Sequence, residues 1–156
     1  MNIRRAKLSD MPGINKLLRQ VLMVHHNGRP DLFKAGAKKY TDEQLAELIQ
    51  DDTKPIFVCV DAEETVLGYA FCVWQQHLNN EILTDVKTLY IDDLCVDEAC
   101  RGKHIGKSLY EYVLAYAKEN NFYNVTLNVW SLNESAMKFY EACGLKPQKI
   151  GMETIL

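Results

Sequence analysis

The chain has 156 residues, of which 47% are hydrophobic and 25% charged, which is the profile of one soluble globular domain over residues 1–156. Its 18 Lys and Arg residues against 21 Asp and Glu residues leave a formal net charge of −3, which argues against a nucleic-acid-binding protein that neutralises phosphates. No apolar run approaches the roughly eighteen residues that a membrane-spanning helix needs, so no membrane partner is expected.

Apolar periodicity and capping residues predict three strands and two helices in the first half of the chain. Pro12 would lie in the first turn of the first helix, where its missing N–H costs little. The second helix opens with a capping box, in which Thr41 and Gln44 satisfy each other's backbone N–H groups. The predicted strands are Asn2–Ala6, Ile56–Val60 and Val66–Trp74, and the predicted helices are Ser9–Gly28 and Thr41–Gln50.

The segment from His25 to Ala37 carries two turn signals and is predicted to be an ordered loop. His25 and His26 are adjacent, so on a helix their side chains would point about 100° apart and could not bind one metal from one face. A zinc site is therefore disfavoured, and no metal is predicted. The loop is expected to form the polar rim of a pocket.

The most informative stretch runs from Tyr90 to Leu114 and reads YIDDLCVDEACRGKHIGKSLYEYVL. Its order is a strand, a basic loop that contains glycine, and a helix whose apolar stripe begins at Ile105. A helix start presents free backbone N–H groups and the positive end of the helix dipole, which attract anions. Gly102 and Gly106 allow an anion to come close to the backbone, and the Arg and Lys side chains of the loop add positive charge.

The remaining elements complete one mixed sheet. Lys87–Val96 and Tyr123–Trp130 are predicted strands, and the helix between them is a crossover that implies parallel pairing. A last helix follows Asn133 and ends at Gly144, and Leu145–Leu156 is expected to add one or two strands. The sequence therefore predicts an α+β domain with a mixed, mostly antiparallel sheet, a parallel central strand pair and helices on both sides.

The cysteines are five, an odd number without a Cys-x-x-Cys pair: Cys59, Cys72, Cys95, Cys100 and Cys143. Most of them sit inside apolar runs, and no signal peptide precedes them. This pattern predicts reduced, buried thiols in a cytoplasmic protein. A catalytic thiol is disfavoured because no partner base stands out in the sequence.

Two phosphate-binding patterns compete for the basic loop. The P-loop, Gly-x-x-x-x-Gly-Lys-Ser/Thr, is matched at its end by Gly106 and Lys107, but it needs a glycine where this chain has Arg101. RGKHIG, from Arg101 to Gly106, resembles instead Gln/Arg-x-x-Gly-x-Gly/Ala, the pyrophosphate-binding signature of the GNAT superfamily of acetyl-CoA-dependent N-acetyltransferases. His104 stands in the place of the first glycine of that signature.

A second block strengthens the resemblance. Asn133, Ala136, Tyr140, Gly144 and Leu145 match Asn-x-x-Ala-x-x-x-Tyr-x-x-x-Gly-Phe/Leu, which closes the coenzyme site in the same superfamily. Two spaced motifs in the right order are more specific than either one alone. The resemblance implies a GNAT-like fold over the whole chain.

The resemblance also implies how acetyl-CoA, the cosubstrate, is held at the carboxyl end of the central strand. The backbone of Leu94, Cys95 and Val96 would pair with the pantetheine arm, and Asn133 and Tyr140 would close over the thioester. The pyrophosphate would be cradled by Arg101, Gly102, Lys103, His104, Ile105, Gly106 and Lys107.

Tyr140, Asp92 and Asp93 are the candidate catalytic residues. A tyrosine hydroxyl, with a pKa of about 10, can protonate a departing thiolate whose thiol has a pKa of about 8.5, and the motif places Tyr140 in that role; a core aromatic residue is the alternative. Carboxylates in a largely apolar strand are costly unless used or paired, so one of the two aspartates would be the base, and the resemblance mildly favours Asp92. They cannot both face one side of the sheet without a bulge. A base acting through water, and simple attraction of a cationic amine, stay open.

The acceptor is expected to be a primary amine of a small molecule or a protein, and its identity stays open. The loops His25–Ala37 and Gln75–Asp85 are expected to rim the acceptor side, where Asp31, Glu81 and Asp85 would favour a cation or would be solvated loop charges. A coenzyme-A-binding or regulatory module without turnover is the alternative function, and a structural domain is a third. A homodimer is left open.

Overall fold

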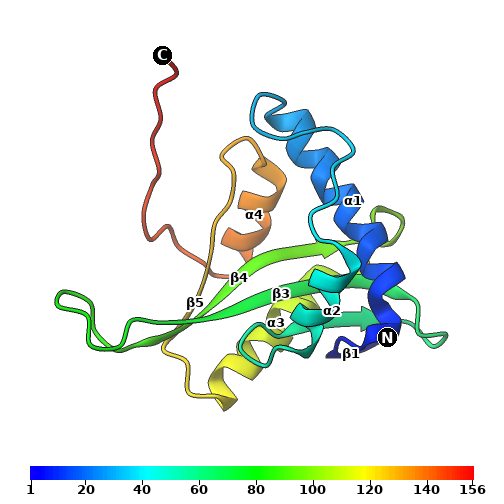
Figure 1. The fold of residues 1–156 in the computed structure, drawn as a ribbon, viewed down its shortest axis with the longest axis horizontal. Coiled ribbons are helices and arrows are strands. Elements are labelled where there is room, and N and C mark those ends of the chain that lie inside the picture. Colours follow the sequence, from blue (N-terminus) through cyan, green and yellow to red (C-terminus); the bar gives the residue numbers. More distant parts are fainter.

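The computed structural model describes all 156 residues and contains one five-stranded sheet (Figure 1). Its strands follow one another in chain order across the sheet. The first four pair antiparallel, and the last two pair parallel, which confirms the predicted mixed, mostly antiparallel sheet. The strands are β1 Asn2–Arg5, β2 Ile56–Val60, β3 Val66–Gln76, β4 Lys87–Val96 and β5 Asn124–Leu127.

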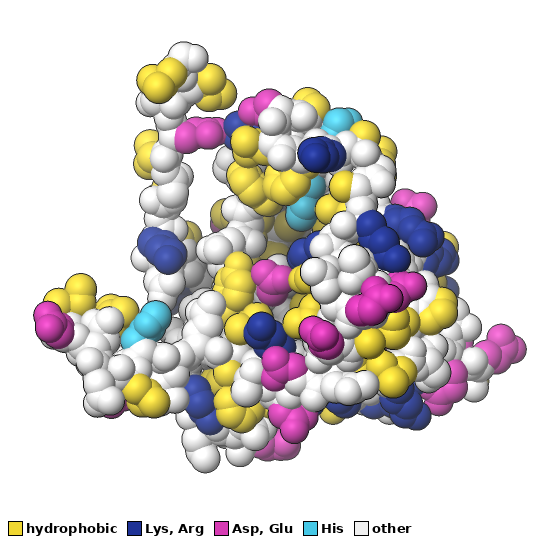
Figure 2. Space-filling model, viewed as in Figure 1, with side chains coloured by type: hydrophobic (Ala, Val, Ile, Leu, Met, Phe, Trp, Pro, Cys, Tyr) yellow, Lys and Arg dark blue, Asp and Glu magenta, His cyan; other side chains and the backbone are white.

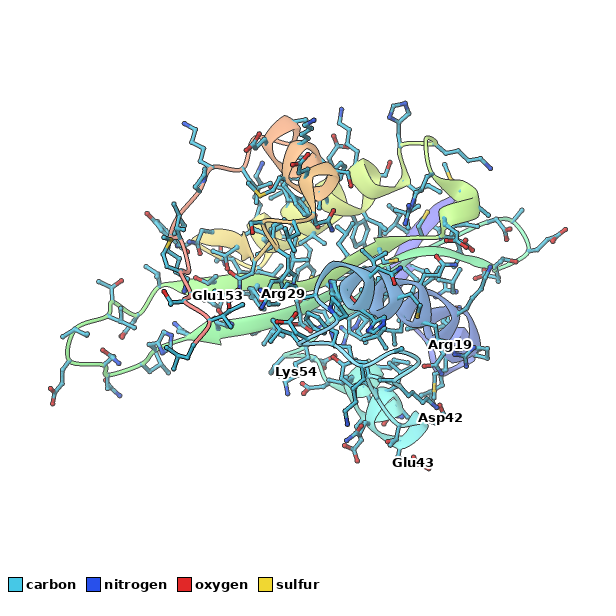
Figure 3. All side chains as sticks on the ribbon, turned by 90° about the horizontal axis from the view of Figure 1, so that it is seen from above. Arg19, Arg29, Asp42, Glu43, Lys54 and Glu153 are labelled. Carbon is cyan, nitrogen blue, oxygen red and sulfur yellow. The ribbon has the colours of Figure 1, made fainter.

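The helices lie on both faces of the sheet, as predicted. Figure 3 shows α1 and α2 on one side of the strands and α3 and α4 on the other. The helices are α1 Met11–Gly28, α2 Asp42–Gln50, α3 Ile105–Glu119 and α4 Glu134–Ala142, with short 3-10 turns at Leu8–Asp10 and Glu98–Cys100. None of these helices combines the length and the apolar character that crossing a membrane would take.

Strand alternation divides the core between the two faces. Along β3, Tyr69 and Phe71 pack with α1 and α2, whereas Ala70 and Cys72 pack with α3. Successive side chains of a strand point to opposite faces, so a nearly continuous apolar run is the sequence of a strand that is covered on both sides. Fully burying one large aliphatic or aromatic side chain contributes about 1.5–3 kcal/mol.

Local signals set the helix ends where the sequence predicted them. Thr41 Oγ1 accepts a hydrogen bond from the Gln44 N–H at 3.1 Å, and Gln44 Oε1 accepts one from the Thr41 N–H at 2.9 Å, so the capping box at the start of α2 is confirmed. At the end of α4, Gly144 has a φ of 95°, and the Leu145 N–H bonds to the Tyr140 carbonyl at 3.1 Å. This pattern is a Schellman cap, which needs a residue with positive φ.

The strands β4 and β5 run together for only part of their length. The parallel pairing joins Thr88–Ile91 to Asn124–Leu127 and stops there. Beyond Ile91, the edge of β4 that faces β5 therefore has no strand partner over Asp92–Val96. This separation opens a gap at the carboxyl end of β4, which is where the motif residues lie.

The last segment of the chain differs from the prediction. The sequence predicted one or two strands in Leu145–Leu156, but the structure has none there. No backbone hydrogen bond within the chain involves residues 146–156, and Figure 1 shows this segment running out along one side of the molecule to the C-terminus. A strand needs a neighbouring strand to satisfy its backbone groups, and in this structure no strand pairs with the segment.

Candidate active site

A bulge in β4 brings the two candidate carboxylates to one side of the sheet. The pairing with β3 passes from Asp93 directly to Ile91, so Asp92 is the extra residue, and a bulge of this kind re-aims side chains. Lys39 lies beside both carboxylates: its Nζ is 3.4 Å from Asp92 Oδ2, and the charge of Asp93 acts on it. The bulge that two inward-facing aspartates would require is therefore present.

Asp93 is the less exposed of the two carboxylates, and it is half-buried. The hydroxyl of the fully buried Tyr69 donates a hydrogen bond to Asp93 Oδ2 at 2.6 Å. Burial raises the pKa of Asp93, although this hydrogen bond and the nearby ammonium of Lys39 act in the opposite direction. A carboxylate with a raised pKa holds a proton more readily, which is the property that a general base near neutral pH needs.

Asp92 lies at the surface beside a lysine that stays charged. The side chain of Asp92 is 36% exposed, and that of Lys39 is 33% exposed. Burial acts against the charge of Lys39, but Asp93, Tyr40 and Asp92 outweigh it and raise the pKa of the lysine. Asp92 therefore serves an ion pair at the mouth of the site, while Asp93 faces the interior.

Tyr140 stands on α4, and Asp93 influences its hydroxyl. Burial, and after it the negative charge of Asp93, raise the pKa of Tyr140. The phenol therefore keeps its proton at neutral pH, as a proton donor must. The candidate acid and the candidate base, which are far apart in the sequence, are thus brought together where β4 and β5 separate.

The basic loop before α3 has the form of an anion site. Arg101, Gly102, Lys103 and His104 are all exposed, and the first turn of α3 leaves its leading N–H groups without partners inside the helix. Gly102 has a φ of 83° and His104 a φ of 60°. Position 104 thus requires the left-handed region, which explains why the superfamily signature has glycine at this place.

Ile105, Gly106 and Lys107 form the first turn of α3, and the first two are held in place by packing. Ile105 is fully buried. A Cβ added at Gly106 would lie 3.3 Å from the Phe139 ring of α4 and 3.5 Å from Val96 of β4. Glycine at this position therefore lets α3 start close against both the candidate coenzyme strand and the helix that carries Tyr140. The charged side chain of Lys107 is exposed and adds to the positive field of the loop.

The end of β4, which consists of Leu94, Cys95 and Val96, connects the two carboxylates to the basic loop. One edge of these residues pairs with β3, and the other edge lies beyond the reach of β5. An extended arm with amide groups could pair with this free edge, as a strand does. Burial raises the pKa of the Cys95 thiol to about 12, which makes this thiol inert. The residues present therefore fit a long ligand with a pyrophosphate at the loop and a reactive end near Tyr140.

A cavity of about 110 Å³ lies between the end of α1 and the segment before α4. Three aromatic rings form part of its wall: the rings of His25 and Phe33 are 5.0 Å apart, and those of Phe33 and Trp130 meet edge to face at 5.4 Å. The space-filling view in Figure 2 shows the molecule hollowed on this side, with hydrophobic side chains in the hollow. The lining residues are Val24, His25, Gly28, Arg29, Phe33, Trp130, Leu132 and Asn133.

The cavity includes only part of the predicted rim. Residues of the His25–Ala37 segment line it, but none of Gln75–Asp85 does; this second segment is the tip of the β3–β4 hairpin, which projects away from the body (Figure 1). Asp31 forms an ion pair with Arg29 at 2.8 Å, whereas Glu81 and Asp85 are exposed. The Asn133 Oδ1 caps α4 by accepting a hydrogen bond from the Ala136 N–H at 3.2 Å.

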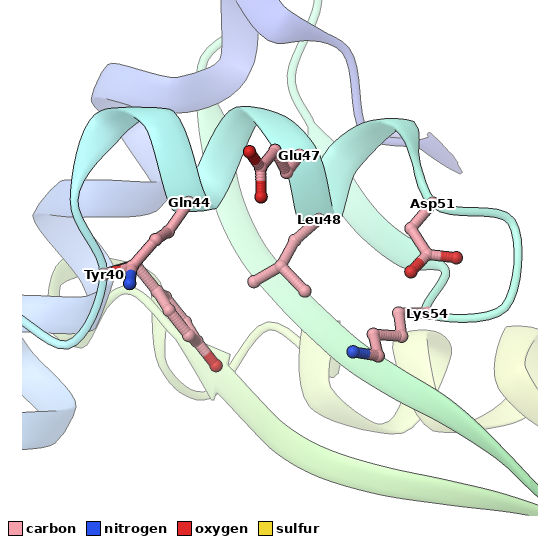
Figure 4. Close-up of a pocket in the computed structure, with 6 residues that line it drawn as sticks. All are labelled: Tyr40, Gln44, Glu47, Leu48, Asp51 and Lys54. Carbon is pink, nitrogen blue, oxygen red and sulfur yellow. The ribbon is translucent and has the colours of Figure 1, made fainter.

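A second, more open hollow of about 270 Å³ lies on α2, shown in Figure 4. Its charged side chains, Glu47, Asp51 and Lys54, are of both signs, and Leu48 faces it. Tyr40 closes one end; burial raises the pKa of its hydroxyl, the charge of Lys39 acts against this rise, and the charge of Asp92 adds to it. The hollow therefore adjoins the carboxylate pair from the side of α2.

Sequence motifs did not indicate Tyr69, Lys39 or Tyr40. Tyr69 sits in an apolar strand and has the pattern of a core residue, and its hydroxyl contact with Asp93 spans 24 residues of sequence. Lys39 reaches Asp92 across 53 residues. The sequence contained one indirect signal. Burying two carboxylates in an apolar strand costs free energy unless they are paired, which predicts that Asp92 and Asp93 have partners but does not identify those partners.

A family model described as the acetyltransferase (GNAT) family matches residues 22–145. A glucosamine 6-phosphate N-acetyltransferase from Arabidopsis thaliana is 31% identical over 61% of this chain and 62% of its own length. A peptidyl-lysine N-acetyltransferase of Salmonella typhimurium is 24% identical over 94% of this chain and 83% of its own length. The chain spans less than two thirds of three of the curated relatives that it matches.

A solved structure resembles the whole chain. A tetramutant of the BH1408 protein from Bacillus halodurans is 31% identical, covers 100% of both chains and superposes with a TM-score of 0.95. The crystal structure of the Arabidopsis thaliana glucosamine-6-phosphate N-acetyltransferase, at 23% identity and a TM-score of 0.72, shows the same fold.

Proposed function

The chain belongs to the GNAT family of acetyltransferases, and we propose on this premise that it transfers an acetyl group from acetyl-CoA to a primary amine by direct attack. The observation that carries the proposal is that the half-buried carboxylate of Asp93 lies near enough to the half-buried Tyr140 phenol for its charge to help raise the pKa of that phenol. Both groups have raised pKa values, chiefly because of burial. A module that only binds the coenzyme would need neither group.

The two groups divide the proton transfers of the reaction. Asp93 would take a proton from the attacking amine nitrogen, directly or through a water molecule, as the new N–C bond forms. Tyr140 would give its proton to the departing sulfur as the C–S bond breaks. Proton transfer by one positioned side chain typically contributes about 10²–10⁴ in rate. Tyr69 would act on the base by holding it in place through the hydrogen bond to Asp93.

The basic loop and the free edge of β4 would hold the coenzyme. The N–H groups at the start of α3, with Arg101 and Lys103, suit a pyrophosphate, and the edge at Leu94–Val96 suits the amides of the pantetheine arm. When bound, acetyl-CoA supplies an activated acetyl group. Five cysteines without a disulfide support a cytoplasmic location, where thiols stay reduced.

The acceptor would be a small amine with an apolar or ring-shaped body. The cavity beside Asn133 is small, at about 110 Å³, and its aromatic wall suits such a body. The carboxylates Asp92 and Asp93 would favour the cationic form of the amine as it approaches. The relatives named for glucosamine 6-phosphate and for peptidyl-lysine support an amine acceptor in general.

A panel of amines tests the proposal, with acetyl-CoA as donor and release of free thiol as the signal. We expect turnover with at least one small amine, and a loss of about 10²–10⁴ in kcat when Asp93→Asn replaces the parent. The melting temperature should rise with coenzyme A and not with ATP and magnesium, because the loop lacks the opening glycine of a P-loop. Coenzyme binding without thiol release from any amine would favour the module without turnover.

A further inference from the structure

Lys39 is an amine of the chain itself that lies against the two candidate carboxylates. Its Nζ is 3.4 Å from Asp92 Oδ2, and its charge opposes the rise in the pKa of Asp93 that burial causes. A lysine side chain carries a primary amine with an ordinary pKa of about 10.4, and the proposed acceptor is a primary amine as well. Lys39 therefore has the same charged group as an acceptor and holds it beside the residues that an acceptor would approach.

Packing and a helix cap hold the backbone of Lys39 in this place. The next residue, Tyr40, stacks its ring on that of Phe71 in β3, with 5.9 Å between the ring centres and 15° between the planes. Phe71 in turn pairs with Asp93 at the edge of the bulge. After Tyr40 comes Thr41, whose capping box fixes the start of α2. The position of Lys39 beside the carboxylates is thus built into the fold.

Lys38, the preceding residue, does not share this position. Its Nζ bonds to Asp42 Oδ1 at 2.9 Å, at the start of α2. The side chain of Lys38 is 52% exposed, against 33% for that of Lys39. Two adjacent lysines therefore have different partners, and Lys38 provides a matched control for Lys39.

The charges at the mouth of the site leave room for one further cation. When both carboxylates are ionised and His25 is neutral, Asp92, Asp93 and Lys39 together carry one negative charge, which one acceptor ammonium would neutralise. A second ammonium on the same acceptor would meet the ammonium of Lys39, and like charges brought together in this way repel. Without Lys39, two ammonium groups would find partners, one at Asp92 and the other at Asp93.

We propose that Lys39 is a specificity-determining residue that occupies the position of a second acceptor ammonium, so that the site takes monoamines in preference to diamines. The inference rests on the proposed function, because it takes Asp93 as the group that the reacting amine reaches. Lys39 has no part in the proton transfers. Its effect is on which amine binds in front of the base.

The substitution Lys39→Met tests the proposal, because it removes the charge and keeps much of the aliphatic side chain. The two probes are butylamine and the four-carbon diamine with an amino group at each end, compared at pH 7 by thiol release from acetyl-CoA. Their amines stay protonated at this pH, as that of lysine does. The ratio of kcat/KM for the diamine to kcat/KM for butylamine should rise by at least about threefold, because one repulsion is lost and one ion pair with Asp92 is gained.

Three further variants separate this charge effect from a structural one. Lys39→Arg keeps the positive charge and should keep the ratio of the parent. Lys38→Met removes the neighbouring charge, which pairs with Asp42, and should also leave the ratio unchanged. The double variant Lys39→Met with Asp92→Asn should lose the gain, because the second ammonium then has no carboxylate to pair with.

A binding measurement decides the same question without turnover. Calorimetric titration of each amine into protein saturated with coenzyme A should show the same rise in the ratio of affinities for Lys39→Met. If the parent turned over no amine, the proposed function would fail, and the ratio of affinities would still decide the role of Lys39. If the parent turned over butylamine but the ratio rose less than threefold in Lys39→Met, the inference alone would fail. An equal rise in Lys38→Met, or a full gain in the double variant, would also overturn it.

Discussion

We propose that the two ends of the candidate site along β4 work by different means. At the bulge, the chemistry would depend on side chains with specific partners: Asp93 accepts a hydrogen bond from Tyr69, and its charge acts on Tyr140. At the loop before α3, the side chains are exposed, and the backbone conformation and the start of the helix would form the anion site. The bulge end would therefore depend on the identity of its side chains, whereas the loop end would depend on the conformation of its backbone.

This difference predicts how each end tolerates substitution. Removing one functional group at the bulge should affect the rate of the chemical step and leave the binding of coenzyme unchanged. Removing one side chain at the loop should affect coenzyme affinity modestly, because the N–H groups that bind the anion remain. The predictions below test this contrast, from the largest expected effect to the smallest.

Asp93→Asn should cause the largest loss, about 10²–10⁴ in kcat, because it removes the proposed base while keeping the shape. Steady-state thiol release measures it. Asp92→Asn is the matched control and should cost much less, since Asp92 lies at the surface in an ion pair with Lys39. An equal or larger loss with Asp92→Asn would transfer the role of base to Asp92.

Asp93→Asn should also change how the stability of the fold depends on pH. The folded-state pKa of Asp93 is raised by burial, so the native state binds this proton more tightly than the unfolded chain does. The contribution of Asp93 to the free energy of unfolding is therefore fully present below the pKa of an aspartate in the unfolded chain, about 3.9. This contribution is lost as the pH rises through the higher pKa of Asp93 in the folded state. Asp93→Asn should unfold at a temperature equal to or above that of the parent at pH 7, and the gain should vanish at low pH in calorimetry.

Tyr140→Phe should lower kcat by at least about 10², because it removes the proton donor and keeps the ring and its packing. Affinity for coenzyme A, measured by calorimetric titration, and the melting temperature should stay near those of the parent. Tyr110→Phe, on the neighbouring helix α3, is the matched control and should change none of these quantities. Activity of Tyr140→Phe within about threefold of the parent would assign the proton to water instead.

Replacing Arg101 and Lys103 together by alanine should raise the dissociation constant of coenzyme A by roughly 2- to 30-fold, since exposed charge pairs are worth about 0.2–1 kcal/mol each. The loss should shrink at high salt, because exposed charges are screened. The value of kcat at saturating coenzyme should not change. A loss of about 10³ or more in affinity would show that side chains rather than backbone groups dominate this end of the site.

His104→Gly should have the smallest effect and a favourable one. The residue has a φ of 60°, and an L-residue in the left-handed region costs about 1 kcal/mol or more. Relief of this strain should raise the melting temperature by about 2–4 °C and leave coenzyme affinity equal or tighter. Asn121→Gly, with a φ of 61°, is the control for strain relief away from the site. Weaker coenzyme binding in His104→Gly alone would show that the imidazole contacts the phosphates.

Sequence alone determined the features that depend on neighbouring residues. The capping box of Thr41, the glycine that ends α4 and the order of strand, basic loop and helix are local, because each satisfies backbone groups a few residues away. The motif spacing also indicated Tyr140, and the cost of burying charge indicated Asp92 and Asp93. The mixed sheet followed from the crossover helix, which forces β4 and β5 to run parallel.

Tertiary structure decided the features that depend on distant partners. The bulge at Asp92 is a matter of register between β3 and β4, and Tyr69 and Lys39 reach the carboxylates from elements far away in the chain. The sequence therefore could not say that Asp93 rather than Asp92 faces the interior. The last segment, Leu145–Leu156, shows the same limit most clearly. One or two strands were predicted there, but a strand exists only where another strand satisfies its backbone groups, and no strand of the folded chain pairs with this segment.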